Sequence, residues 1–327
     1  MTKPNQFATR RAVLAALASA PFTGAWAQGV VPAGGNLSMV VPFAPGGITD
    51  SLARVVASKL GERLNTPVIV VNKAGGGTTI ATREVANAAG DGRTLLLTAV
   101  PYVTNPLLLA NLPYDPKALE PLILAGIATA ILFVHPSLPI TNVAELVAYA
   151  RQNPGKLSFA SSGNGTIPHL AAELFASMTG TDVIHVPFQG TGPAIANVLG
   201  GQVSGIFDSL LSWNHVQAGK LRPIAVANSS RLARAPDLPT FHESGLPEFL
   251  AFSWFGFVVP ASTPAEVQAK VFSDLRAVLD DKEVLGKFPG YGLETVPAVR
   301  TQTDFRGFLE RERVKWSKLI RERNLKI

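Results

Sequence analysis

Residues 40–57 are VVPFAPGGITDSLARVVA, and this stretch decides the fold because its pattern changes from strand to helix across two glycines. The apolar run that ends at Phe43 predicts a buried strand. Gly46 and Gly47 predict the turn, and Asp50–Leu64 carries its apolar residues at helical spacing. A strand, a glycine loop and a helix in this order form the repeating unit of α/β domains.

Residues 159–176, FASSGNGTIPHLAAELFA, repeat the same plan. Other short apolar runs predict further strands at Leu37–Phe43, Val68–Val71, Thr94–Thr98, Leu157–Ala160, Val183–Phe188, Val203–Phe207 and Pro223–Ala227. Strands that alternate with helices in this way favour mostly parallel sheets covered by helices on both faces. Because the two matched units lie far apart in the sequence, we expect one in each of two lobes.

Two long apolar runs, Gly126–His135 and Ala251–Val259, are each followed by a proline-containing turn and not by a glycine loop and helix. We interpret them as a pair of strands that cross between the lobes. This assigns residues 28–131 and 256–327 to lobe 1 and residues 132–255 to lobe 2. Two helical patterns then return the chain to lobe 1, at Pro264–Asp280 and Gln302–Arg323. Lobes joined by two crossings leave a cleft between them, which is a favoured place for a ligand.

The composition excludes several classes of protein. Of the 327 residues, 47% are hydrophobic and 16% are charged, which excludes a disordered chain. Residues 1–27 hold three basic residues and no acidic one, and removing these three from the 29 basic residues leaves 26 against 23 acidic ones. That small surplus is weak support for a nucleic-acid partner. The absence of cysteine excludes disulfides, thiol nucleophiles and a lipid-modified N-terminal cysteine.

Residues 1–27 have the pattern of an export signal. Lys3, Arg10 and Arg11 precede the apolar run Ala12–Ala20, and Ala25–Ala27 gives the small-x-small cleavage pattern. The apolar run is too short to span a bilayer. We therefore expect cleavage between Ala27 and Gln28 and a mature protein in the periplasm, with the Sec and twin-arginine routes both open.

Three glycine-containing loops stand directly before helical patterns: Pro45–Asp50, Ser161–Thr166 and Gly190–Pro193. Glycines let consecutive backbone N–H groups point one way, and a helix start adds unpaired N–H groups and the positive end of the dipole. If the lobes face each other, these loops converge on the cleft and favour an anion such as a carboxylate. The alternative is that the loops only cap their helices. Gly75–Gly77 predicts a tight turn near the cleft rim.

Two carboxylates are expected near the cleft. Asp50, in the first turn of its helix, stabilises the helix by roughly 0.3–1 kcal/mol, but it would repel an anionic ligand. Either it points into its own helix start, or it accepts a hydrogen bond from a ligand donor or a bridging water. Asp208, at the end of a strand pattern, raises the same two alternatives.

The sequence offers little for catalysis or for a metal. The five histidines are scattered, and none forms a His-x-x-x-His pair. The Gly-x-Ser-x-Gly nucleophile motif and the nucleotide-binding glycine motifs are absent. We interpret His169 and His185 as structural residues. We therefore expect no catalytic residue, no metal site and no cofactor.

A set of short motifs stands in a specific order along the chain: VPFAPGGITD at 41–50, LPYD at 112–115, ASSGNGT at 160–166 with His169, HVPF at 185–188, GQV at 201–203 with Phe207 and Asp208, GKLR at 219–222 and LPT at 238–240. Because of the order and spacing of these motifs, the chain resembles the Bug family from about Leu37 to its C-terminus. These proteins are the extracytoplasmic solute receptors of tripartite tricarboxylate transporters.

The resemblance implies a two-lobed periplasmic-binding-protein fold, type II-like, that closes over an organic carboxylate. It also implies that backbone N–H groups of the first-lobe and second-lobe glycine loops hold that carboxylate, partly through ordered waters. The expected ligand-binding residues are Phe43, Ala44, Gly46, Gly47, Thr49, Asp50, Ser161, Ser162, Gly163, Asn164, Gly165, Thr166, His169, Phe188, Gly190, Thr191 and Asp208.

The chain departs from the family pattern at Phe188-Gln189-Gly190, where Tyr-Lys-Gly is usual. A hydroxyl and a positive charge near the cleft are lost, so the contacts of this loop are expected to differ. We expect a monomeric, non-enzymatic receptor that hands a carboxylate to membrane transporter subunits. The alternatives are an enzyme on the same fold, with His169 or Asp208 as acid or base, and a ligand sensor for a membrane signalling protein.

Overall fold

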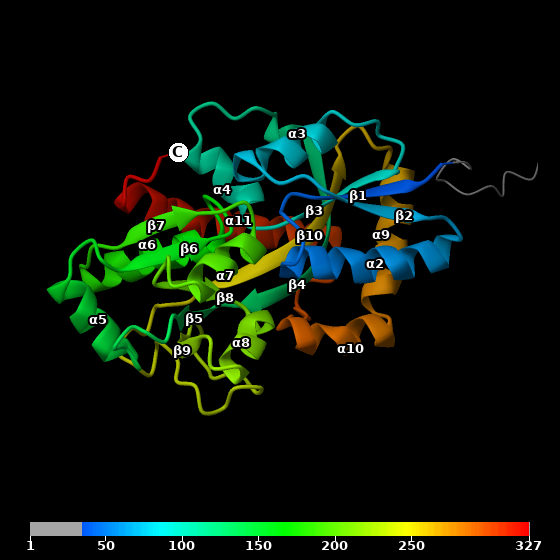
Figure 1. The fold of residues 1–327 in the computed structure, drawn as a ribbon. Coiled ribbons are helices and arrows are strands. Elements are labelled where there is room, and N and C mark those ends of the chain that lie inside the picture. Colours follow the sequence, from blue (N-terminus) through cyan, green and yellow to red (C-terminus); the bar gives the residue numbers. More distant parts are fainter. Residues whose placement is uncertain (1–34, 327) are drawn as a thin grey trace, which may run out of the picture.

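The computed structural model describes residues 35–326, so the predicted export signal lies outside the described residues. The chain forms two five-stranded sheets, each flanked by helices (Figure 1). The predicted two-lobed α/β fold is therefore confirmed. In Figure 1 the first lobe, in blue, cyan and orange, lies beside the second lobe in green.

The first sheet has the strand order β2-β1-β3-β10-β4. Its strands are β1 (Leu37–Val41), β2 (Val68–Asn72), β3 (Thr94–Thr98), β4 (Leu119–Thr129) and β10 (Phe252–Pro260). The helices of this lobe are α2 (Ile48–Leu64), α3 (Thr79–Ala86), α4 (Pro101–Leu108), α9 (Ala265–Leu279) and α10 (Lys282–Tyr291). One core cluster packs the buried apolar faces of α2 and α9 against the sheet.

The second sheet has the strand order β7-β6-β8-β5-β9. Its strands are β5 (Ile131–Val134), β6 (Ser158–Ser161), β7 (Ile184–Pro187), β8 (Gly205–Asp208) and β9 (Arg222–Val226). Its helices are α5 (Val143–Gln152), α6 (Ile167–Thr179), α7 (Thr191–Leu199) and α8 (Trp213–Gln217).

Each sheet contains one strand that runs against the others. In the first sheet β10 is antiparallel to both β3 and β4, and in the second sheet β5 is antiparallel to both β8 and β9. The remaining strands of each sheet share one direction. Because parallel strands end at the same edge, the loops after β1, β6, β7 and β8 come to one side of their sheets.

The chain passes from one lobe to the other over fewer residues than the sequence suggested. The run Gly126–His135 is not one strand but the end of β4 and all of β5, separated by Ala130. Ile131, expected in lobe 1, pairs with Asp208 in the second sheet. Phe252–Phe255, expected in lobe 2, pair with β4 in the first sheet. The boundaries that these contacts favour are 35–129 with 252–326, and 131–251.

The C-terminal helix α11 (Gln302–Glu322) contacts both lobes, which the sequence pattern did not predict. It packs on α4 and β4 of the first lobe and on α6 of the second (Figure 1). Trp316, Leu319 and Ile320 join a core cluster that also contains Leu170 and Phe175 of α6. Burial of this apolar face against both lobes stabilises their association at α11.

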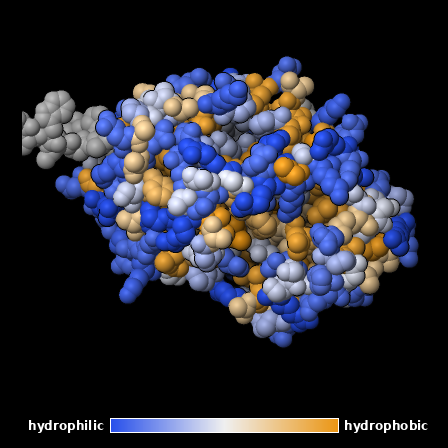
Figure 2. Space-filling view, turned by 180° about the vertical axis from the view of Figure 1, so that it is seen from behind, coloured by the Kyte–Doolittle hydropathy of each residue, from blue (hydrophilic) through white to orange (hydrophobic). Residues whose placement is uncertain are grey.

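The outer surface mixes hydrophilic residues with scattered apolar ones, as Figure 2 shows for the face seen from behind. The two sheets supply the buried core, whose largest side chains include Trp254, Phe133 and Phe257. Within residues 35–326, no helix combines the length and the apolar character needed to cross a membrane.

Candidate functional site

A cavity lies where the two lobes meet, with about 40 Å³ of free space and an opening to solvent. Its lining comes from both sheets and from the starts of α2, α6 and α7.

The first-lobe loop brings the start of α2 to the cavity. Gly47 is the residue before the helix, with φ −89° and ψ 176°, and Gly47, Ile48 and Thr49 all line the cavity. Gly46 has φ +93°, a left-handed conformation that favours glycine. The first turn therefore presents backbone N–H groups toward the space between the lobes.

Asp50 turns toward its own helix start and does not line the cavity. The backbone N–H of Gly46 and Nε of Arg54 each donate to its Oδ2 at 3.1 Å, and Asn72 Nδ2 donates to its Oδ1 at 3.0 Å. Burial on its own raises the pKa of Asp50, but the hydrogen bonds from Arg54, Gly46 and Asn72 outweigh it and hold the pKa below its ordinary value. Of the two alternatives for Asp50, the geometry favours the helix-start role.

The second-lobe loop, residues 161–166, is held by bonds within itself. The hydroxyl of Thr166 donates to the carbonyl oxygen of Gly163 over 2.6 Å. Gly163 has φ +130° and Gly165 has φ +73°. A Cβ on Gly165 would lie 2.7 Å from Thr104 Oγ1, so the close approach of α4 requires glycine there.

Two histidines, His169 buried and His185 half-buried, support this loop from behind. The rings of His169 and His185 stack with centroids 3.9 Å apart. The backbone N–H of Gly165 donates to His169 Nδ1 over 3.1 Å, and Ser161 Oγ lies 2.6 Å from His185 Nε2. Burial lowers the pKa of His169 to about 3 and that of His185 to about 4, so both rings are neutral at pH 7.

A third loop closes the site from the second lobe. The backbone N–H of Ala44 donates to the carbonyl oxygen of Gln189 over 2.9 Å. A Cβ on Gly190 would lie 3.1 Å from the nitrogen of Ala44, which shows how closely the two loops approach. Thr191 then begins α7 and lines the cavity. The lobes therefore stand in a closed arrangement.

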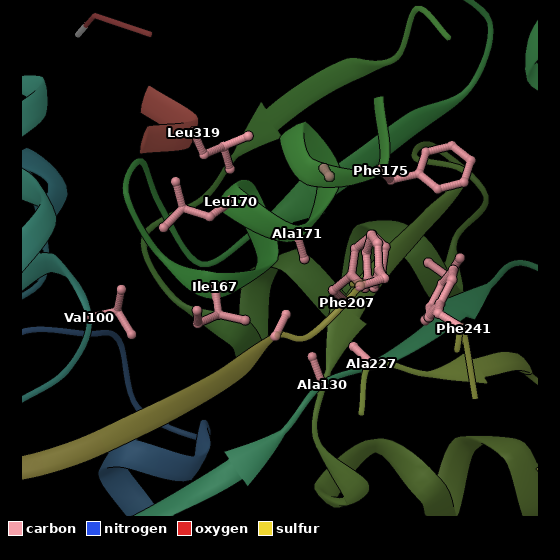
Figure 3. Close-up of a cluster of buried hydrophobic side chains, with 14 of the residues drawn as sticks. Val100, Ala130, Ile167, Leu170, Ala171, Phe175, Phe207, Ala227, Phe241 and Leu319 are labelled. Carbon is pink, nitrogen blue, oxygen red and sulfur yellow. The ribbon is translucent and has the colours of Figure 1, made fainter. Parts of the chain in front are cut away.

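The remaining wall of the cavity is mainly apolar. Figure 3 shows Val100, Ala130, Ile167 and Phe207 around the junction of the lobes, and all four line the cavity. Asp208, 8% exposed, lies among them at the end of β8. Burial raises the pKa of Asp208 to about 6, although the Ser212 hydroxyl, which donates to Oδ2, and the Ser209 backbone act in the opposite direction.

The structure brings many of the sequence-predicted residues together. Those that line the cavity are Phe43, Gly47, Thr49, Ser162, Thr166, Thr191 and Asp208. An adjoining pocket is lined by Gly163, Asn164 and Phe188, and by Gly75–Thr78 from the loop that we expected at the rim. Predicted residues that line neither space are Ala44, Gly46, Asp50, Ser161, Gly165, His169 and Gly190.

Sequence reasoning missed much of the wall. The additional lining residues are Ile48, Ala99, Val100, Pro101, Ala128, Ala130, Ile167, Pro168, Phe207, Ser209, Ser253 and Phe255. Three of them, Ile48, Ile167 and Pro168, follow the glycine loops directly, so position alone signals them. Ala128, Ser253 and Phe255 lie on β4 and β10, where the sequence shows only apolar strands. Within residues 35–326, no group of three or more His, Asp or Glu side chains is placed to hold a metal ion.

Comparison with known proteins places this geometry in context. Residues 52–325 match the family model described as tripartite tricarboxylate transporter family receptor. The chain is 34% identical over 297 residues to Protein BugT of Bordetella pertussis, which covers 89% of this chain and 90% of that protein. It is 32% identical over 293 residues to a protein of Pseudomonas sp. strain P51 encoded in the tcbD-tcbE intergenic region, with 88% and 86% covered.

Solved structures of similar proteins share the fold. The periplasmic binding protein BugD matches with a TM-score of 0.83 at 31% identity, over 89% of this chain and 98% of that one. Rpa4515 of R. palustris, solved with adipate, matches with a TM-score of 0.84 at 32% identity and the same coverage. MatC of Rhodopseudomonas palustris, solved with bound malate, matches with a TM-score of 0.82 at 29% identity, over 87% and 98%.

Proposed function

The chain belongs to the tripartite tricarboxylate transporter receptor family, and we propose that it captures a small organic carboxylate in the cavity between its lobes and delivers it to a membrane transporter. The proposed site comprises the predicted residues that line this cavity and its adjoining pocket. The other predicted residues hold the loops of the site in place.

One observation carries this proposal: the starts of three helices, α2, α6 and α7, meet at one cavity and come from both lobes. Unpaired N–H groups and the positive end of the helix dipole favour an anion at each of them. Parallel strands gather such loops within each sheet, but they do not require that helix starts from two different lobes line the same cavity. A carboxylate bound among them would join the two lobes and favour the closed arrangement.

The ligands of two relatives support the proposal that this protein binds a carboxylate. Rpa4515 is described with adipate and MatC with malate, and both compounds are small organic carboxylates. We infer from them that a carboxylate is the common element of recognition. The departure at Phe188 and Gln189 predicts that the rest of the ligand differs from that of the usual family member.

We propose that the protein acts in the periplasm after removal of residues 1–27, as a monomer whose membrane partners are transient. The export-signal pattern and the family support this location. We also propose that it is a receptor and not an enzyme. His169, a candidate base in the enzymatic alternative, holds the Gly165 N–H behind the loop and does not line the cavity.

A thermal-shift screen of the refolded, ligand-free protein tests the proposed function. The panel contains mono-, di- and tricarboxylates, amino acids, aromatic acids, and sugars as matched neutral compounds. A ligand at about 100 times its Kd adds roughly 2.7 kcal/mol, so the Tm rises by several degrees. Shifts confined to carboxylates support the proposal. Shifts with sugars only, or none in a protein shown to be folded, contradict it.

A further inference from the structure

Polar and apolar groups are unevenly distributed over the wall of the cavity between the lobes. The helix starts and hydroxyl groups supply hydrogen-bond donors, whereas most of the remaining wall is apolar. Among the described residues that line the cavity, Asp208 is the one ionisable side chain, and no lysine, arginine or histidine lines it. The site therefore offers an acceptor with a negative charge inside a space that otherwise favours an anion.

Asp208 lies beside the loop that is proposed to hold the carboxylate. It ends β8, which pairs in parallel with β6, and the register places Ala160 opposite Ile206. β6 ends at Ser161 and β8 ends at Asp208, and both Ser162 and Asp208 line the cavity. Neighbouring strands are about 4.8 Å apart. If a ligand carboxylate binds at Ser162, a substituent on the neighbouring carbon of the ligand can therefore reach the Asp208 carboxylate.

The Asp208 carboxylate retains acceptor capacity for a ligand. Its Oδ2 accepts from the Ser212 hydroxyl, and the Ser209 backbone is a second partner. An ionised carboxylate has about four acceptor positions, so these two partners leave others unfilled. A buried carboxylate without a cation costs free energy, and a donor on the ligand would offset that cost.

We propose that the site selects a carboxylate that carries a hydrogen-bond donor, either a hydroxyl or an ammonium group, on the carbon next to the carboxylate, and that Asp208 accepts from this donor. The inference rests on the proposed function and narrows its ligand class. The apolar wall covers the remainder of the ligand, including contacts with Val100, Ile167 and Phe207. A second carboxylate placed against Asp208 would be repelled.

Four compounds of equal chain length test this proposal: butanoate, 2-hydroxybutanoate, 2-aminobutanoate and butanedioate. Their affinities for the wild-type protein are measured by isothermal titration calorimetry, together with those for Asp208→Asn. The amide preserves the shape and one acceptor oxygen but removes the charge. Asp182→Asn is the matched control, because Asp182 is an exposed residue of the same lobe that lines neither the cavity nor the adjoining pocket.

In the wild-type protein, we expect the hydroxy acid or the amino acid to bind at least tenfold more tightly than butanoate and butanedioate. The tighter of the two identifies the donor. Asp208→Asn is expected to reduce that preference at least threefold for the hydroxyl and tenfold for the ammonium group, whereas Asp182→Asn leaves it unchanged.

Three results would overturn the inference. Butanoate or butanedioate binds as tightly as the substituted acids, or Asp208→Asn leaves every ratio unchanged, or none of the four binds although another carboxylate of the thermal-shift panel does. If no carboxylate binds at all, the proposed function itself fails, and the two failures are thereby separated.

Discussion

The backbone N–H of Ala44 donates a hydrogen bond to the carbonyl oxygen of Gln189 over 2.9 Å, and this bond joins the first-lobe loop to the second. Nearby, the carbonyl oxygen of Pro45 stands 3.1 Å from the place that a Cβ on Gly192 would take. These contacts lie at the edge of the cavity. Opening of the lobes would therefore break this bond, and closure would restore it.

Gly192→Val is expected to hinder closure. Gly192 lies in the first turn of α7, within the α-helical segment, so the backbone tolerates a side chain. The side chain would press against the Pro45 carbonyl of the other lobe. We expect the affinity for a carboxylate identified in the screen to fall about tenfold, which is about 1.4 kcal/mol. Calorimetry measures the affinity, and small-angle X-ray scattering measures the compaction that ligand causes. Wild-type affinity with full compaction would contradict this role of the loops.

Gly47→Val is expected to fill the cavity without disturbing the fold elsewhere. Gly47 has φ −89°, which any residue adopts, and its Cβ would stand 3.5 Å from the Thr191 side chain across the cavity. We expect loss of most of the affinity for the screened carboxylate. Gly286→Ala in α10 is the control, because no atom lies within 4 Å of its Cβ position. Gly163 is less suitable, since its φ of +130° strains any side chain. Unchanged affinity in folded Gly47→Val would remove this loop from the site.

Asp208 predicts a pH dependence of stability. Its folded pKa of about 6 lies above the value of 3.8 for an unperturbed aspartate. The unfolded state therefore loses its proton first, and stability falls as the pH rises from about 4 to about 6. A shift of about two pKa units is worth about 3 kcal/mol. Asp208→Asn should be more stable than the wild type at pH 8 and of similar stability at pH 4. Urea unfolding of the ligand-free proteins measures both, and a pH-independent difference would contradict the assignment.

The stacked histidines predict sensitivity to acid. The pKa values of His169 and His185 are lowered by burial to about 3 and about 4, so the unfolded state binds more protons below the unperturbed pKa of 6.5. Their contribution to stability therefore falls as the pH decreases from about 6.5 to about 4. The double variant His169→Gln/His185→Gln should be less stable at pH 7 but show a flatter dependence over this range. An equally steep dependence in urea unfolding would show that other groups cause it.

The local plan of the chain is readable in its sequence, and the long-range assembly of the site is not. The stretch 40–57 carries its own strand, loop and helix signals, and these depend on near neighbours. The cavity wall, by contrast, joins Ala128 on β4 to Ser253 on β10, and neither an alanine nor a single serine within an apolar run signals which strand it will pair with. The span of α11 across two lobes also depends on tertiary packing, since its apolar face does not encode its partners.

The roles of individual side chains also depend on the long-range assembly of the fold. The sequence raised two alternatives for Asp50 and Asp208 alike, because Asp50 follows a glycine loop and Asp208 ends a strand pattern, and both positions are expected near the cleft. Three donors, Gly46, Arg54 and Asn72, surround Asp50, and Asn72 reaches it from the next strand. Asp208 instead lies against the cavity with Ser212. Only the folded arrangement of partners separates the two carboxylates.

We propose that the cavity binds a small carboxylate reversibly and leaves it chemically unchanged. Equilibrium dialysis of the ligand-free protein against the best carboxylate of the screen, followed by mass spectrometry of the released compound, tests it most directly. We expect one bound carboxylate per chain, recovered unaltered, with most of the binding lost in Gly47→Val and binding retained in Gly286→Ala. Conversion of the compound, or equal binding in both variants, would contradict it.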